Sequence, residues 1–240
     1  MIPLHDDNPT TITPALTIAF IVTCVLVFFY QVSLPGDAGQ GFVYHYGAIP
    51  TLVFGTAALP PEVAALPAFM TLVTSMFLHG GWMHLIGNML YLWIFGNNIE
   101  DVMGHGRFIV FYLACGILAA LSHAVTDPGS NIPMVGASGA ISGVLGAYLL
   151  LYPRARVLVL IPFGFFTRIM YVPAGFVLGL WFLLQLFSGG ASLGRGGGGV
   201  AWFAHVGGFV AGMALIGLFK RSDVRFFAPA HHRSSRSSRW

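Results

Sequence analysis

The chain has 240 residues, of which 56% are apolar and 8% are charged, and its formal net charge is +3. A soluble domain averages roughly 25% charged residues, so this composition excludes an ordinary water-soluble globule and indicates a protein embedded in lipid. The basic residues are not gathered beside aromatic residues on a polar stretch, which argues against nucleic acid as a partner. Cys24 and Cys115 lie inside apolar runs and are interpreted as small core residues, not as a disulfide or a metal site.

Six segments are long and apolar enough to cross a bilayer, and none contains Asp, Glu, Lys or Arg. They predict an all-α, polytopic membrane protein with a bundle of six transmembrane helices. In chain order the segments are approximately Thr13–Ser33, Gly81–Ile99, Phe108–Ala124, Val135–Tyr152, Met170–Phe187 and Val200–Phe219. The predicted organisation is an N-terminal cytoplasmic tail over 1–12, a six-helix domain over 13–219 with its motifs at 79–212, and a basic C-terminal cytoplasmic tail over 220–240.

Two further apolar stretches are too short or too interrupted to span. Leu66–Leu78 contains Pro67 and is predicted to be interfacial or re-entrant. Val157–Phe166 is broken by Pro162 and is predicted to be a turn at the level of the headgroups.

The distribution of positive charge supports this topology. Six spans with a cytoplasmic C-terminus place ten of the 11 Lys and Arg residues inside and leave only Arg195 outside. Cytoplasmic loops of membrane proteins carry the excess of Lys and Arg. Both termini are therefore predicted to be cytoplasmic.

Three polar residues share one predicted depth. His84, Ser138 and His205 each follow the start of a span that enters from the outer face, by three to five residues. At about 1.5 Å per residue they lie roughly 5–8 Å below the outer boundary. Polar groups are costly at membrane depth and usually have a function there, so the shared level predicts one site.

The residue types suit nucleophilic catalysis. A serine hydroxyl needs an adjacent base, and the imidazole of His205 is suited to accept the proton of Ser138. Ser138 begins a predicted helix, where free N–H groups and the helix dipole favour developing negative charge. His84 and Asn88 are four residues apart on one helix face, and both can donate hydrogen bonds to an oxyanion.

Small residues at helical spacing would let the fourth and sixth spans approach closely enough to join the serine to the histidine. Gly136 and Gly139 also leave room for a carbonyl group beside Ser138. The set consists of Gly136, Gly139, Gly143, Ala204, Gly208 and Gly212.

Each feature taken alone has a simpler interpretation. Ser138 among glycines is typical of helix packing, and His205 alone would fit a buried core histidine or a proton relay. His84 and Asn88 alone would fit interhelical hydrogen bonding, and His79 would fit an interfacial residue before the second span. A metal centre is not predicted, because His79 and His84 do not share a helix face and no His-Glu-x-x-His motif occurs.

In combination the motifs resemble those of the rhomboid intramembrane serine proteases. The matching patterns are His79-x4-His84-x3-Asn88, Gly136-Ala137-Ser138-Gly139 and Ala204-His205-x2-Gly208-x3-Gly212, with Glu100 as the carboxylate at the inner end of the second span. The resemblance implies a bacterial inner-membrane protein whose active site opens toward the outer face. It also implies cleavage of membrane-anchored proteins in or near their transmembrane segments, without a cofactor.

The same resemblance implies the roles of the site residues. Ser138 is the expected nucleophile and His205 the general base of a dyad that has no third carboxylate. His84, Asn88 and the backbone N–H of Ser138 are the expected oxyanion hole. The chain departs from many members in two places. Many members carry a Trp-Arg pair in the loop between the first two spans, whereas residues 34–80 here contain neither Trp nor Arg. Ser142 stands where some members carry an aromatic residue that packs against the histidine. The candidates for orienting His205 are therefore packing, backbone carbonyls and a hydrogen bond from Ser142.

Two other functions remain open from the sequence. A proteolytically silent relative that binds membrane clients is expected to lack the serine or the histidine. A transporter would use His84 and His205 as a proton relay, and that class often shows repeated halves.

The predicted orientation can be measured directly. A reporter fused after Trp240 is expected to read cytoplasmic, and one inserted near Asp127 is expected to read external, because the positive charges then lie inside. Paired alkaline phosphatase and fluorescent protein fusions provide the measurement. An external C-terminus would contradict both the span count and the shared depth of the three polar residues.

Overall fold

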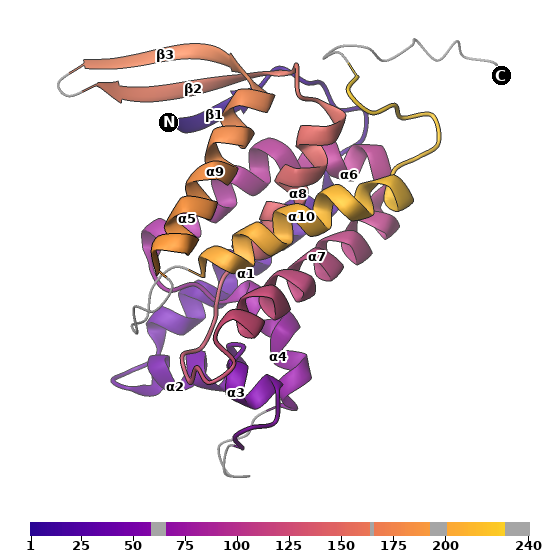
Figure 1. The fold of residues 1–240 in the computed structure, drawn as a ribbon. Helices are drawn as coiled ribbons and strands as arrows, with labels where there is room; N and C mark the ends of the chain where they lie inside the picture. The colour runs from indigo at the N-terminus through magenta and orange to yellow at the C-terminus, as the bar shows by residue number, and fades with distance from the viewer. Residues whose placement is uncertain (59–65, 164–165, 193–200, 229–240) are drawn as a thin grey trace.

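A computed structural model describes residues 1–58, 66–163, 166–192 and 201–228. The described part is mostly helical, with one small sheet at the end of the bundle that holds the N-terminus (Figure 1). Arg195, Val200 and the tail beyond residue 228 lie outside the described residues. The helices are α1 (Ala15–Ser33), α2 (Ala38–Tyr46), α3 (Pro50–Val53), α4 (Ala68–Thr74), α5 (Trp82–Tyr91), α6 (Asn97–Met103), α7 (His105–Thr126), α8 (Ser138–Leu151), α9 (Ala174–Ser192) and α10 (Trp202–Phe219).

Four helices of the described chain are long and apolar enough to cross a membrane by length and composition, namely α1, α7, α9 and α10. The sequence predicts six spans. The predicted second span is helical without a break from Trp82 to Met103, but a π-helical turn over Leu92–Gly96 separates α5 from α6. The predicted fourth span is α8, which has only 14 residues. By length and composition, the described helices therefore include four candidate spans, not six.

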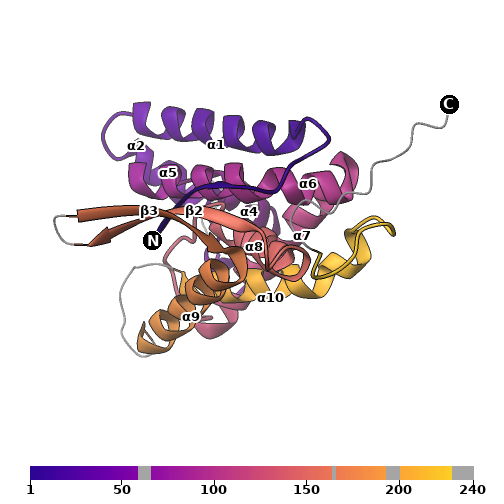
Figure 2. The ribbon, with the colours of Figure 1, turned by 90° about the horizontal axis from the view of Figure 1, so that it is seen from above.

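The short helix α8 lies at the centre of the bundle. Seen from above, α1 and α9 lie on opposite sides of it (Figure 2). Eleven of its 14 residues are buried, so protein and not lipid surrounds it. At 1.5 Å per residue α8 extends about 21 Å, which is less than the ~30 Å hydrocarbon thickness of a bilayer. Its two ends therefore cannot both reach the membrane surfaces.

Glycines bring the backbones of α8 and α10 into direct contact. A Cβ atom added to Gly208 would lie within 3.0 Å of the carbonyl group of Gly139, and one added to Gly212 would lie within 3.0 Å of that of Gly143. Side chains larger than hydrogen are therefore excluded along this seam, as in close helix pairs of membrane proteins.

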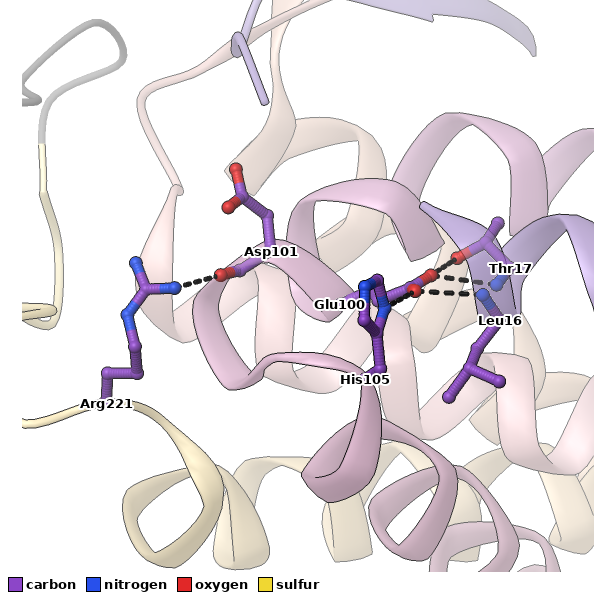
Figure 3. Close-up of polar contacts among 6 residues, drawn as sticks. All are labelled: Leu16, Thr17, Glu100, Asp101, His105 and Arg221. Carbon is purple, nitrogen blue, oxygen red and sulfur yellow. Dashed lines mark hydrogen bonds and ion pairs between the residues drawn. The ribbon is translucent and has the colours of Figure 1, made fainter. Parts of the chain in front are cut away.

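A buried carboxylate ties α6 to the start of α1 (Figure 3). Glu100 is fully buried and accepts hydrogen bonds from the backbone N–H groups of Leu16 (2.9 Å) and Thr17 (2.8 Å) and from the Thr17 hydroxyl (2.7 Å). His105 also contacts the carboxylate. The first N–H groups of a helix have no partner within it, so Glu100 caps α1 from another segment of the chain.

The neighbouring residue extends this connection. The carboxylate of Asp101 accepts hydrogen bonds from the backbone N–H (2.7 Å) and the hydroxyl (2.9 Å) of Thr11. Its backbone carbonyl accepts one from the guanidinium of Arg221 (2.6 Å), just beyond α10 (Figure 3). The segments that precede α1 and follow α10 are thereby joined at the end of α6.

The fold is mostly helical, as expected, but it is not all-α, because three strands form an antiparallel sheet in the order β1-β2-β3. The strands are β1 (Ile2–Asp6), β2 (Arg156–Phe163) and β3 (Phe166–Pro173). The predicted turn at 157–166 is mostly β2, whose valines at 157 and 159 are fully buried. Valine is enriched in strands because its branched side chain packs well on a pleated surface.

The predicted start of the fifth span at Met170 is also wrong. Met170 lies in β3, and α9 begins only at Ala174, directly after Pro173. A proline disfavours the helical conformation in the residue before it and fits best in the first turn of a helix or before it. The residues from Met170 to Phe187 are apolar throughout, so hydropathy could not indicate where the strand ends and the helix begins.

The seam between α8 and α10 generates a stability prediction. Gly212→Ala is expected to lower the free energy of unfolding by about 1–3 kcal/mol or more, because the new methyl group collides with the backbone of Gly143. The measurement is the thermal unfolding midpoint in detergent. Gly217→Ala on the same helix is the control, since its nearest atom is 3.8 Å away and alanine favours the helix. Equal behaviour of the two variants would contradict a close-packed seam.

Candidate active site

The structure brings the serine and the histidine together from two helices. Ser138 is the first residue of α8, and His205 is the fourth residue of α10. Nε2 of His205 lies 2.8 Å from Oγ of Ser138, which is hydrogen-bond distance. Both residues are partly buried. A neutral imidazole with a free lone pair on Nε2 can accept the proton of this hydroxyl.

The other nitrogen of the histidine ring has an amide partner. Nδ1 of His205 lies 2.7 Å from Oε1 of Gln185, a buried residue of α9 that is 8% exposed. An amide oxygen only accepts hydrogen bonds, so this contact requires the proton on Nδ1. The lone pair of the ring then lies on Nε2, which faces Ser138. Gln185 belongs to none of the motifs in the sequence, and its one signal there is that it is a lone amide in a long apolar segment.

Two tryptophans pack around the histidine ring. The ring centroid of Trp181, on α9, is 5.9 Å from that of His205, and the centroid of Trp202, on α10, is 6.2 Å from it in an edge-to-face arrangement. Neither residue was singled out from the sequence. Together they pack against the ring of His205 from α9 and α10.

Ser142, one of the candidates for orienting His205, directs its hydroxyl hydrogen bond elsewhere. Its hydroxyl is fully buried and donates a hydrogen bond of 2.6 Å to the backbone carbonyl of Ser138, one turn earlier in α8. Serine within a helix commonly bonds the carbonyl four residues before it. This local bond uses the donor of the hydroxyl, and Gln185 supplies the contact to the histidine.

The two expected oxyanion donors lie beside the turn that precedes Ser138. A Cβ atom added to Gly136 would lie 2.7 Å from Nε2 of His84 and 3.5 Å from Nδ2 of Asn88. Gly136 also has φ of +120°, a conformation that favours glycine. This turn explains why α8 begins at Ser138, three residues later than the predicted start of the span.

The donor atoms of His84 and Asn88 remain available to bind an oxyanion. The backbone N–H of Gly80 donates to Nδ1 of His84 (3.3 Å), so a neutral His84 carries its proton on Nε2, the atom that faces Gly136. Nδ2 of Asn88 is buried and has no hydrogen-bond partner among the described residues. A buried donor without a partner is rare and costly, and a transient oxyanion would give this one a partner.

The backbone N–H of Ser138 lies in the first turn of α8, where N–H groups have no partner within the helix. It is the third donor near the Ser138 hydroxyl. Three donors close to a hydroxyl and an imidazole can stabilise the negative charge that forms on a carbonyl oxygen during acyl transfer.

His79 packs against His84. It is fully buried, and its ring packs edge-to-face on that of His84 with centroids 5.3 Å apart. Its backbone carbonyl accepts a hydrogen bond of 2.9 Å from the side chain of Gln31 on α1. His79 therefore supports the position of His84. In the part of the chain that the structure describes, no group of three or more His, Cys, Asp or Glu side chains could hold a metal ion.

Comparison with known proteins gives a family and several relatives. The Rhomboid domain model matches residues 67–222. The chain is 35% identical to the rhomboid protease GluP of Bacillus subtilis over 136 residues, which is 57% of this chain and 24% of that protein. It is 38% identical to the putative rhomboid protease YdcA of the same species over 78 residues, which is 32% of this chain and 39% of that protein.

A mitochondrial relative covers more of the chain. Rhomboid protein 1 of Saccharomyces cerevisiae is 29% identical over 191 residues, which is 72% of this chain and 52% of that protein. The chain thus spans between about a quarter and about half of the length of these three relatives. The domain match covers most of the chain and includes every motif of the site, so the chain belongs to the rhomboid family of membrane proteins.

Proposed function

We propose that this chain is an intramembrane serine endopeptidase that cleaves helical, membrane-anchored proteins in or near their transmembrane segments. The observation that carries the proposal is the contact of 2.8 Å between Oγ of Ser138 and Nε2 of His205. The three donors beside Ser138 support it, because a nucleophile and a base without oxyanion stabilisation would lack the largest single contribution to acyl transfer. GluP, a relative by sequence, is named as a rhomboid protease.

The first half of the reaction follows from these positions. Oγ of Ser138 attacks the carbonyl carbon of the scissile bond as its proton passes to Nε2 of His205. The negative charge on the tetrahedral oxygen accepts hydrogen bonds from Nε2–H of His84, Nδ2–H of Asn88 and the Ser138 N–H. The C–N bond then breaks, and His205 gives its proton to the leaving amine.

The second half repeats these steps with water. His205, neutral again, accepts a proton from water, which attacks the ester carbon of the acyl-enzyme. The same donors hold the second oxyanion, and collapse returns the proton to Oγ of Ser138. All groups required belong to the chain itself, so the mechanism uses no cofactor.

The topology that suits this function has six spans, both termini in the cytoplasm and the site open toward the outer face of the plasma membrane. The continuous helical stretch from Trp82 to Met103 supports a second span, despite its π-helical turn. The buried position of α8 supports a helix that starts inside the membrane thickness. Substrates would reach Ser138 from the lipid, and water from the outer face.

Mutation of the pair provides the direct test of the function. Ser138→Ala and His205→Ala are each expected to remove nearly all cleavage of a model transmembrane substrate, and the double variant is expected to be little worse, because the two act as a unit. Labelling of Ser138 by a fluorophosphonate should be lost as well. Ser33→Ala, at the exposed end of α1, is the control that keeps both activities. Turnover by purified Ser138→Ala would exclude a serine protease, and an unlabelled wild type would favour a silent client-binding relative or a transporter.

The oxyanion donors generate a separate kinetic prediction. Asn88→Ala and His84→Ala are each expected to lower kcat more than they raise KM, since their hydrogen bonds are strongest in the transition state. The loss of one such donor costs about 2.7–4 kcal/mol in a soluble serine protease. Met83→Ala is the control, because Met83 lies on the same helix and is 80% exposed. Changes confined to KM would show that the two residues only hold helices together.

A further inference from the structure

The feature that the expected dyad leaves unexplained is the fixed orientation of the His205 ring. Imidazole can carry its proton on either nitrogen, and only the form with a free lone pair on Nε2 can accept the proton of Ser138. In soluble serine proteases a buried aspartate selects this form by accepting a hydrogen bond from Nδ1. Here the atom at hydrogen-bond distance from Nδ1 is Oε1 of Gln185.

The surroundings of Gln185 hold it in place. Trp181 lies one turn earlier in α9, and its ring packs against the ring of His205. Phe209 lies one turn after His205 in α10, and it stacks on both Trp181 (6.1 Å between centroids) and Phe182 (4.5 Å). The aromatic stack therefore fixes the register of α9 on α10, and this register sets Gln185 opposite Nδ1.

We propose that Gln185 is the positioning residue of the site, which makes the arrangement a serine–histidine–glutamine triad with an amide in place of the usual carboxylate. The proposal rests on the proposed function, since a tautomer matters for catalysis only where Ser138 is the nucleophile. An amide oxygen supplies the acceptor that the tautomer needs but carries no full negative charge. It therefore orients the ring without strongly favouring the imidazolium.

Two substitutions separate the acceptor from the packing. Gln185→Leu keeps a similar shape and removes the acceptor, so kcat and the rate of fluorophosphonate labelling are expected to fall roughly 10–100-fold, part of the ~10²–10⁴-fold contribution of a positioned base. KM is expected to stay unchanged. Gln185→Glu keeps an acceptor and is expected to restore most of the rate. As the pH is lowered, Gln185→Glu should lose activity at a higher pH than the wild type does, because a carboxylate favours the protonated ring.

The control is Leu184→Ala, which alters the adjacent residue of α9 on its exposed side. Wild-type rates in Gln185→Leu, or equal losses in Gln185→Leu and Gln185→Glu, would overturn the proposal, because packing alone would then explain the residue. A fall in kcat restored by glutamate, with the shifted pH profile, would establish it.

A spectroscopic measurement decides the proposal independently of protease activity. Histidine-selective ¹⁵N NMR of the full chain in micelles, with the His205 signals assigned by their loss in His205→Ala, reports which nitrogen carries the proton. The wild type is expected to show Nδ1–H, and Gln185→Leu a mixture of both forms. A wild type with the proton on Nε2 would refute the role of Gln185. A wild type that shows Nδ1–H but no Ser138-dependent labelling would refute the proposed function and leave the contact standing.

Discussion

The close approach of α8 and α10 is the constraint on which the site depends. The hydroxyl of Ser138 and the imidazole of His205 belong to different helices, and their contact of 2.8 Å leaves little tolerance, since hydrogen bonds weaken steeply at longer distance. Gly208 and Gly212 lie one and two turns beyond the histidine, where their missing side chains let the two backbones meet. In the membrane this contact gains no hydrophobic driving force, so it relies on packing of the backbones themselves.

The opposite end of the bundle is held by a different kind of interaction. Glu100 and Asp101 are buried carboxylates whose oxygens accept hydrogen bonds from the start of α1 and the segment before it. A buried charge is stable only when its hydrogen-bonding capacity is satisfied. These contacts therefore fix α1 relative to α6 (Figure 3), and α6 continues through the π-helical turn from the helix that carries His84 and Asn88. Glu100 and Asp101 thus support α5, which forms the side of the site opposite α10.

The third support comes from α9, which is exposed over much of its surface but contacts His205 through Trp181 and Gln185. Phe176, Leu183, Leu184 and Phe187 are exposed, whereas Gln185 is buried against His205. Ser138 comes from α8, His205 from α10, Gln185 from α9, and His84 and Asn88 from α5. The four helices must therefore be assembled before these side chains can meet.

The sequence by itself determined the membrane character of the chain, most of the helical segments and the pairing of Ser138 with His205, because these follow from local properties: hydropathy, residue type and distance from the start of a span. It also indicated that His84 and Asn88 lie near the serine. Only the tertiary structure decided the partner of Nδ1, since Gln185 belongs to no motif and reaches His205 through the register of α9 on α10. The sheet was equally hidden, because β1 pairs with β2 across some 150 residues of sequence and hydropathy does not distinguish a buried strand from a turn at the membrane surface. The described residues form four helices long enough to span a membrane where the sequence predicts six, for a related reason. Hydropathy cannot tell a helix such as α8, which protein surrounds, from a helix that lipid surrounds, because both are equally apolar.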